Sequence, residues 1–172
     1  MLTRTIAVLS LAAMHQLGLA KTSGDPFNPF LGADLKHRLA AFNGVLLGFD
    51  GGEWVGGLLF LDASGQPHEL LHENVQAIIK TSKGVFVFTG LGHLSLLNGA
   101  VYKLVASSGQ EPRAQLIRQL PGFPLSIRRR QDGTHPFLVL ISNERPDGRK
   151  YECFRLAGEA VVQSSNCSRP PQ

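Results

Sequence analysis

After its first twenty residues, the chain of 172 residues lacks any apolar run long enough to span a bilayer, which takes roughly 20 residues. The opening segment MLTRTIAVLSLAAMHQLGLA combines Arg4, a short apolar run and the small residues Gly18 and Ala20 before Lys21. This pattern is typical of a Sec signal peptide. We therefore predict that residues 1–20 are cleaved and that residues 21–172 form one soluble, exported domain. An N-terminal buried helix or membrane anchor is the alternative interpretation of the same segment.

Stacking aromatic residues are missing beside the densest basic run. The formal net charge is +4, and Arg128, Arg129 and Arg130 follow one another with no aromatic residues alternating with them. A nucleic-acid platform needs such rings next to its cations. A solvated strand end, or a docking point for an acidic partner, explains the run better, and no nucleic-acid partner is expected.

Catalytic motifs are also missing. The chain has no G-x-S-x-G elbow, its segment GLGHLSLLNG lacks the G-K-[ST] of a phosphate loop, and its acidic turn residues lack calcium-loop spacing. The lone Trp54 is expected to pack in the core rather than to anchor an interface. We predict a protein that is not an enzyme and has no catalytic residues, cofactor or metal.

Cysteine is scarce, with Cys153 and Cys167 as the two residues of this type. In an exported protein a single pair is most simply a disulfide. It would close a loop of roughly 15 residues and stabilise the fold by about 3 kcal/mol in the chain-entropy model. A cysteine nucleophile is the competing interpretation, and it requires a free thiolate with a nearby base.

Glycine, by contrast, is frequent, and its 19 residues lie among short apolar runs, which predicts an all-β domain with little helix. The joints NGVLLGFDGG, KTSKGVFVF and RRQDGTHPF resemble hairpins. The lead-in Lys36–Phe42 is expected to be a helical turn or irregular. The predicted strands are Val45–Phe49, Val55–Leu61, Val75–Ile79, Val85–Thr89, Ala100–Val105, Ala114–Gln119, Leu125–Arg129, Pro136–Ile141, Lys150–Leu156 and Ala160–Gln163.

Three segments share one layout: Gly56–Leu71, Gly99–Ile117 and Gly148–Gln163 each contain a glycine, an apolar strand, a turn with alanine and glycine, and a second amphipathic strand. Periods of roughly 40–50 residues are typical of propeller blades, but three units are too few for an ordinary closed propeller. We predict antiparallel sheets in about three propeller-blade-like units, open or sandwich-like. In this arrangement VASSGQ joins the last two strands of the middle unit.

The stretch HELLH matches the zincin motif, in which His68 and His72 would bind zinc from a helix while Glu69 activates water. The repeat instead aligns this stretch with a strand, where i and i+4 side chains lie about 13 Å apart, too far for one metal. A zinc-dependent periplasmic hydrolase and a non-catalytic envelope scaffold both remain open as alternatives.

The segment VYKLVASSGQEPRAQ, the export signal, the three-unit β pattern and the two late cysteines together resemble the periplasmic immunity proteins of type VI secretion amidases, the partners of amidase effector family 1. The resemblance implies a 1:1 complex with an NlpC/P60-type cysteine amidase, which cuts peptidoglycan through a Cys thiolate activated by His. It further implies that the immunity protein occludes this Cys/His cleft, and so protects the producing cell and its siblings.

The residues of the middle turn suit a segment that fills such a cleft. Ser107 and Ser108 offer small hydroxyls to an imidazole or a thiolate, Gly109 permits close approach of the backbone, and Gln110 can imitate substrate amides. Because VASSGQ is one serine longer than DASGQ in the first unit, its tip is expected to project further. We predict that these four residues form the inhibitory, partner-binding loop.

Overall fold

Twelve β-strands and no helix make up the part of the chain that this computed structural model describes, which is residues 30, 32–93, 96–107, 110–129, 137–142 and 151–164. The prediction of an all-β domain is confirmed. The predicted signal peptide, residues 1–20, lies outside these ranges. Within them, no helix has the length and apolar character that crossing a membrane requires.

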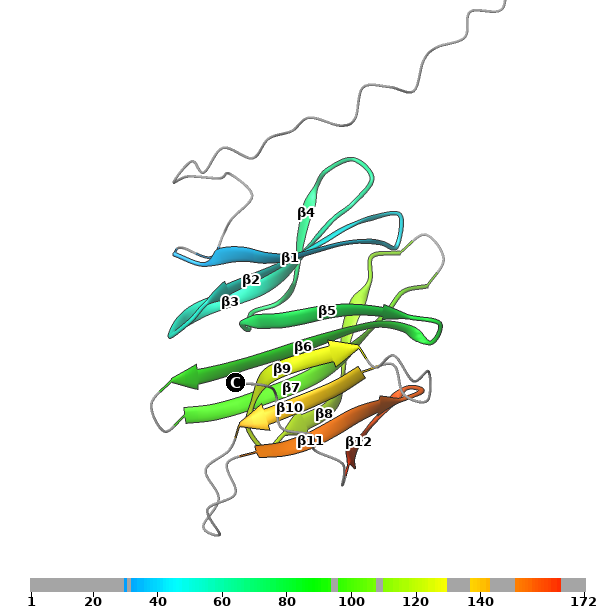
Figure 1. Cartoon of the computed structure of the whole chain (residues 1–172). Coiled ribbons are helices and arrows are strands. Elements are labelled where there is room, and N and C mark those ends of the chain that lie inside the picture. Colours follow the sequence, from blue (N-terminus) through cyan, green and yellow to red (C-terminus); the bar gives the residue numbers. More distant parts are fainter. Residues whose placement is uncertain are drawn as a thin grey trace, which may run out of the picture.

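The strands form three four-stranded antiparallel sheets, each with its strands in chain order and none closed into a barrel (Figure 1). The first sheet contains β1–β4, the middle sheet β5–β8 and the third sheet β9–β12. The strand bounds are β1 Asp34–Ala41, β2 Gly44–Gly51, β3 Trp54–Leu61, β4 Pro67–Leu71, β5 Val75–Thr81, β6 Gly84–His93, β7 Leu96–Val105, β8 Arg113–Leu120, β9 Phe123–Arg129, β10 Phe137–Ser142, β11 Tyr151–Ala157 and β12 Ala160–Ser164.

The internal repeat corresponds to the second half of each sheet. The three aligned segments form β3–β4, β7–β8 and β11–β12, the last two strands of the first, middle and third sheets. The VASSGQ segment lies between β7 and β8, as the repeat predicts. Antiparallel sheets are therefore confirmed, while the likeness of the three sheets to propeller blades stays a prediction.

The middle sheet lies between the other two sheets (Figure 1), and its strand β6 is buried on both faces. On β6, Val85, Phe86, Val87 and Phe88 are each at most 4% exposed. The two phenylalanines pack in a core cluster with side chains of the third sheet, and the two valines in a cluster with side chains of the first. Because successive side chains of a strand point to opposite faces, the continuous apolar run GVFVF is what a doubly covered strand requires.

The lead-in segment forms a strand, which corrects the expectation of a helical or irregular Lys36–Phe42. It makes up most of β1, which pairs with β2 up to Ala41 opposite Gly44. Phe42 and Asn43 both have positive φ, 54° and 59°, as the two central residues of a type I′ hairpin turn require. Alanine and lysine are poor strand formers, so the composition of this segment does not predict a strand. Pairing with β2 stabilises it.

Trp54 is on the surface, which corrects its expected place in the core. Its side chain is 67% exposed at the start of β3. The adjacent β2–β3 turn is held instead by buried Asn74, whose Oδ1 accepts from the Gly51 N–H at 2.8 Å and whose Nδ2 donates to the Gly52 carbonyl at 2.6 Å. The turn is thus anchored by a polar side chain, and the indole takes no part in the anchor.

Candidate functional site at the β7–β8 turn

The β7–β8 connection, residues 106–112, is the longest of the three equivalent turns, which span residues 62–66 in the first sheet and 158–159 in the third. The Gln110 N–H donates to the Ser107 carbonyl at 3.0 Å, the i to i+3 bond of a β-turn. Both of these residues are exposed, whereas Pro112 is buried at the base of the connection. Ser108 and Gly109, the other two predicted loop residues, lie outside the described residues.

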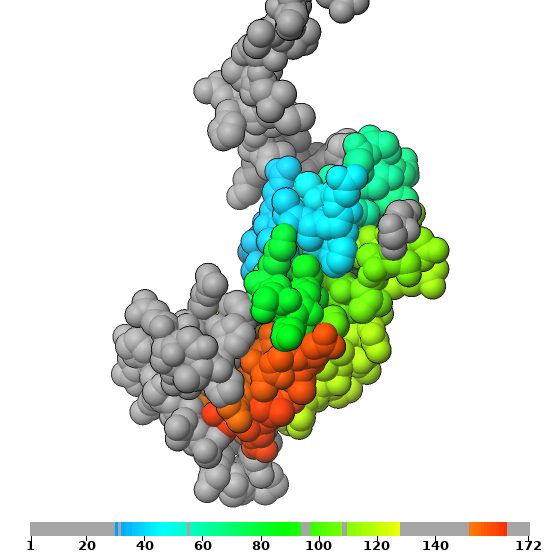
Figure 2. Space-filling model, turned by 90° about the vertical axis from the view of Figure 1, so that its right-hand side faces the viewer, coloured from blue at the N-terminus to red at the C-terminus, as the bar shows by residue number. Residues whose placement is uncertain are grey.

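This turn borders an open depression of about 690 Å³. Three turns meet there, β1–β2, β3–β4 and β7–β8, at one end of the molecule (Figure 1). Figure 2 shows the teal segment of the first sheet lying against the lime segment of the middle sheet on this side. The depression is lined by the rings of Phe42 and Phe60 and by polar side chains, among them those of Asn43, Ser64, Ser107 and Gln110. The surroundings of the turn therefore combine polar side chains with two apolar rings.

In the equivalent turn of the first sheet, one carboxylate accepts several of the turn's own donors. Asp62 Oδ1 accepts from the Ser64 hydroxyl at 2.6 Å and from the N–H groups of Ser64 and Gln66 at 2.8 and 2.9 Å. These bonds, led by the one from the hydroxyl, hold the pKa of Asp62 well below its usual range. Gly65 supplies the positive φ of 85° that this tight turn needs.

In the sequence alignment, the middle turn has Val105 in place of Asp62. Val105 is the last residue of β7, opposite Arg113, and its side chain cannot accept a hydrogen bond. The carboxylate of the β7–β8 connection, on Glu111, contacts His68 instead. Within the described ranges, neither the Ser107 hydroxyl nor the Gln110 side-chain amide has a hydrogen-bond partner. These exposed groups remain available to donate to, and accept from, another molecule.

His68 connects the two turns. Its Nε2 lies 3.2 Å from Asp62 Oδ2 in the first turn, and its Nδ1 lies 2.9 Å from Glu111 Oε1 in the β7–β8 connection. The imidazole is 23% exposed and is tilted against the ring of Phe60, with 6.3 Å between the ring centroids. No spacing in the sequence identified Glu111 as its partner, because the contact joins two sheets.

The HELLH stretch does not form the helix on which a zincin binds its metal. Its first four residues belong to β4, as the repeat predicts. His68 contacts Asp62 and Glu111, whereas His72 contacts Glu69 at 2.9 Å. Among the described residues, no group of three or more His, Cys, Asp or Glu side chains is placed to hold a metal ion.

Of the remaining predicted residues, the structure describes Arg128, Arg129 and Cys153, all in strands of the third sheet. Cys153 is disulfide-bonded and 1% exposed, and it stands opposite Ser164 in the β11–β12 ladder. Cys167, with which it is predicted to pair, lies outside the described residues, as does Arg130. Arg128 and Arg129 are the last two residues of β9.

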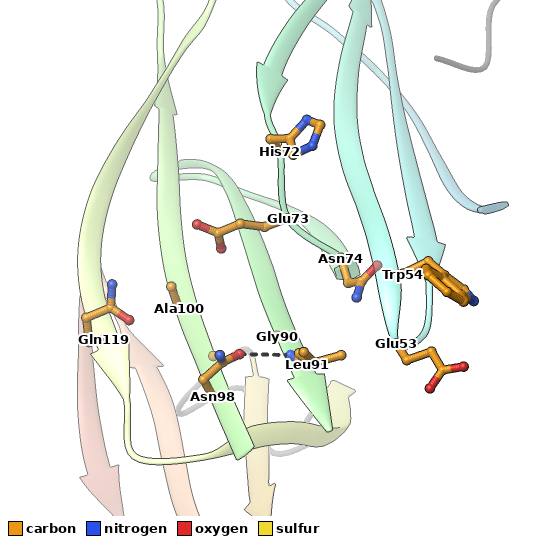
Figure 3. Close-up of a pocket in the computed structure, with 11 residues that line it drawn as sticks. Glu53, Trp54, His72, Glu73, Asn74, Gly90, Leu91, Asn98, Ala100 and Gln119 are labelled. Atoms are coloured by element: carbon orange, nitrogen blue, oxygen red, sulfur yellow. Dashed lines mark hydrogen bonds between the residues drawn. The ribbon is translucent and has the colours of Figure 1, made fainter. Parts of the chain in front are cut away.

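A second pocket, of about 390 Å³, escaped the sequence analysis (Figure 3). Glu73 lies in it and accepts hydrogen bonds from the hydroxyls of Thr89 and Tyr102, each at 2.5 Å. Burial first, and then the bond to Glu73, raises the pKa of Tyr102. Figure 3 shows Trp54 on the opposite side of the pocket from Gln119. The carboxylate is occupied by the hydroxyls of β6 and β7, so we interpret it as a cross-link between the linker after β4 and the middle sheet.

No family model, curated protein or solved structure matches this chain.

Proposed function

We propose that this protein is a periplasmic immunity protein that binds a type VI-secreted NlpC/P60-type cysteine amidase in a 1:1 complex and occludes its active-site cleft with the β7–β8 turn. The observation that carries the proposal is the difference between the equivalent turns. The middle one is the longest, and its exposed Ser107 and Gln110 carry polar side chains without partners among the described residues.

The chemistry of the turn suits a cleft that contains a thiolate and an imidazole. A serine hydroxyl can donate to either group or accept from the imidazole, and the small side chains of Ser107 and Ser108 would pass the walls of a narrow groove. Exclusion of peptidoglycan by the inserted backbone would carry most of the inhibition. The hydrogen bonds would add specificity, because each neutral bond contributes only about 0.5–1.5 kcal/mol.

Two substitutions that enlarge the turn test the proposal. The probe is the NlpC/P60-type amidase encoded beside the gene for this chain, and calorimetry measures its affinity while peptidoglycan hydrolysis measures inhibition. Wild-type protein is expected to bind tightly and block hydrolysis. Changing both Ser107 and Ser108 to Trp should weaken binding by roughly 100-fold or more, because the rings no longer fit the groove.

The control is Ala160→Trp, which places the same ring at an exposed residue directly after the equivalent turn of the third sheet. It is expected to bind like the wild type. Unchanged affinity of the double variant would remove the β7–β8 turn from the interface, and a wild-type protein that does not bind the amidase would overturn the proposed function.

A further inference from the structure

We infer that His68 is a positioning residue for the inhibitory turn: it ties the β7–β8 connection to the rigid β3–β4 turn and so holds the turn ready for the cleft of the amidase. This inference rests on the proposed function. The feature that supports it is one half-buried imidazole whose two nitrogens both face carboxylate oxygens, one from each turn.

The first-sheet side of this contact is fixed in place. Asp62 Oδ1 accepts three hydrogen bonds from Ser64 and Gln66, while its second oxygen, Oδ2, faces His68. The imidazole itself lies against Phe60, which is 3% exposed. Asp62 and Phe60, both of the first sheet, therefore fix the orientation of the imidazole independently of the β7–β8 connection.

On the middle sheet, the contact between His68 and Glu111 restricts the conformation of the β7–β8 connection. Glu111 contacts His68 and directly precedes buried Pro112, whose ring fixes its own φ and confines the residue before it to extended conformations. Gln110 directly precedes Glu111, and its N–H closes the β-turn on Ser107. Holding the Glu111 side chain therefore limits the orientations available to the 107–110 turn.

The chemistry of the ring explains why histidine suits this place. The two nitrogens of a histidine lie at different positions of one rigid ring, so a single side chain faces both carboxylates. A glutamine amide has donors on a single nitrogen and cannot span the two carboxylates with the same geometry. Pre-ordering the turn lowers the conformational entropy lost on binding, which is the general route by which a rigid loop gains affinity.

The first test needs no partner. In the free protein, amide hydrogen exchange of Gln110 reports how often the turn opens, because this N–H closes it. His68→Gln and Glu111→Gln should each raise that exchange rate several-fold. The matched control is His72→Gln, which removes a histidine paired with Glu69 at the same distance of 2.9 Å; it should leave the rate unchanged. Equal rates in the wild type and His68→Gln would overturn the inference.

The second test is a double-mutant cycle on affinity for the neighbouring-gene amidase, measured by calorimetry. His68→Gln and Glu111→Gln should each weaken binding by roughly fivefold to tenfold, the size of one hydrogen bond. The affinity of the double variant should equal that of the single variant with the lower affinity, because both changes break the same contact. A general loss of stability would instead lower the melting temperature and give additive effects.

The two proposals can fail separately. Wild-type protein that does not bind the amidase contradicts the proposed function, and the exchange experiment still decides whether His68 orders the turn. Wild-type protein that binds, with His68→Gln binding equally well, contradicts the positioning role alone.

Discussion

The turn after β3 and the turn after β7 have nearly the same sequence, DASGQ and VASSGQ, and occupy equivalent places in two sheets. In the first, Asp62 accepts from the Ser64 hydroxyl and from the N–H groups of Ser64 and Gln66, while the exposed Gln66 side chain has no partner among the described residues. In the second, Val105 takes the place of the aspartate in the sequence alignment, and the side chains of Ser107 and Gln110 have no partners among the described residues.

The two turns therefore differ in whether the first serine has an acceptor within the turn: the Ser64 hydroxyl donates to Asp62, whereas the Ser107 hydroxyl has no partner among the described residues. The Asp62 carboxylate also supports the neighbouring turn through His68. An apolar residue in the same place leaves the polar groups of the turn for a partner to satisfy. The four predictions that follow test this comparison, from the largest expected effect to the smallest.

Converting the middle turn into the first, by Val105→Asp with deletion of Ser108, should have the largest effect. The new carboxylate would accept the turn's own donors, and the shorter turn would not reach into the cleft. Affinity for the amidase, measured by calorimetry, should fall by roughly 100-fold or more, while the thermal unfolding transition stays cooperative. An affinity within about twofold of the wild type would mean that neither turn length nor the missing acceptor matters.

Asp62→Ala should lower the melting temperature by a few degrees, because three donors in the first turn lose their acceptor. Differential scanning calorimetry measures the change. The control is Val105→Ala, which removes the equivalent side chain in the middle turn, where no donor depends on it. Equal shifts in the two variants would contradict the difference between the turns.

The stabilisation by Asp62 should also depend on pH. Its pKa is lowered in the folded state, so its contribution is fully present above the unfolded-state value near pH 4 and is lost as the pH falls further. The difference in unfolding free energy between wild type and Asp62→Ala should therefore shrink as the pH falls below about 4. Urea unfolding at a series of pH values measures it, and a difference that grows on acidification would reverse the sign.

Ser107→Ala should have the smallest effect. It removes one hydroxyl and leaves the backbone plug intact, so binding to the amidase should weaken by about 0.5–1.5 kcal/mol, with no change in melting temperature. Calorimetry with the amidase measures the first and scanning calorimetry the second. A loss as large as that of the double tryptophan variant would show that hydrogen bonding, rather than steric exclusion, dominates inhibition.

Much of the fold follows from local patterns. Short apolar runs between glycine-containing joints predict the strands, and three aligned segments predict which turns are equivalent. Two predictions were wrong, that Lys36–Phe42 is helical or irregular and that Trp54 is buried. Residues that form strands poorly obscure a strand that a neighbouring strand stabilises. The sequence around a lone tryptophan does not show whether the side chain faces the core or the solvent.

The candidate site could be predicted in part. The extra serine of the middle turn is visible in the sequence, and with it Ser107 and Gln110. The partnership of His68 with Glu111 is not, because it joins the first sheet to the middle sheet and no spacing rule relates residues in two separately folded ladders. The zincin match drew attention to His68 for a chemistry that its strand does not support.

By itself, the sequence determined the alternation of strands and turns, the equivalence of the three hairpins and the replacement of Asp62 by Val105 in the aligned middle segment, because each depends on residues close together in the chain. The stacking of the sheets decided the rest. It buried both faces of β6, gathered three turns around one depression and brought His68 between two carboxylates. These contacts depend on packing between sheets, which local patterns do not encode.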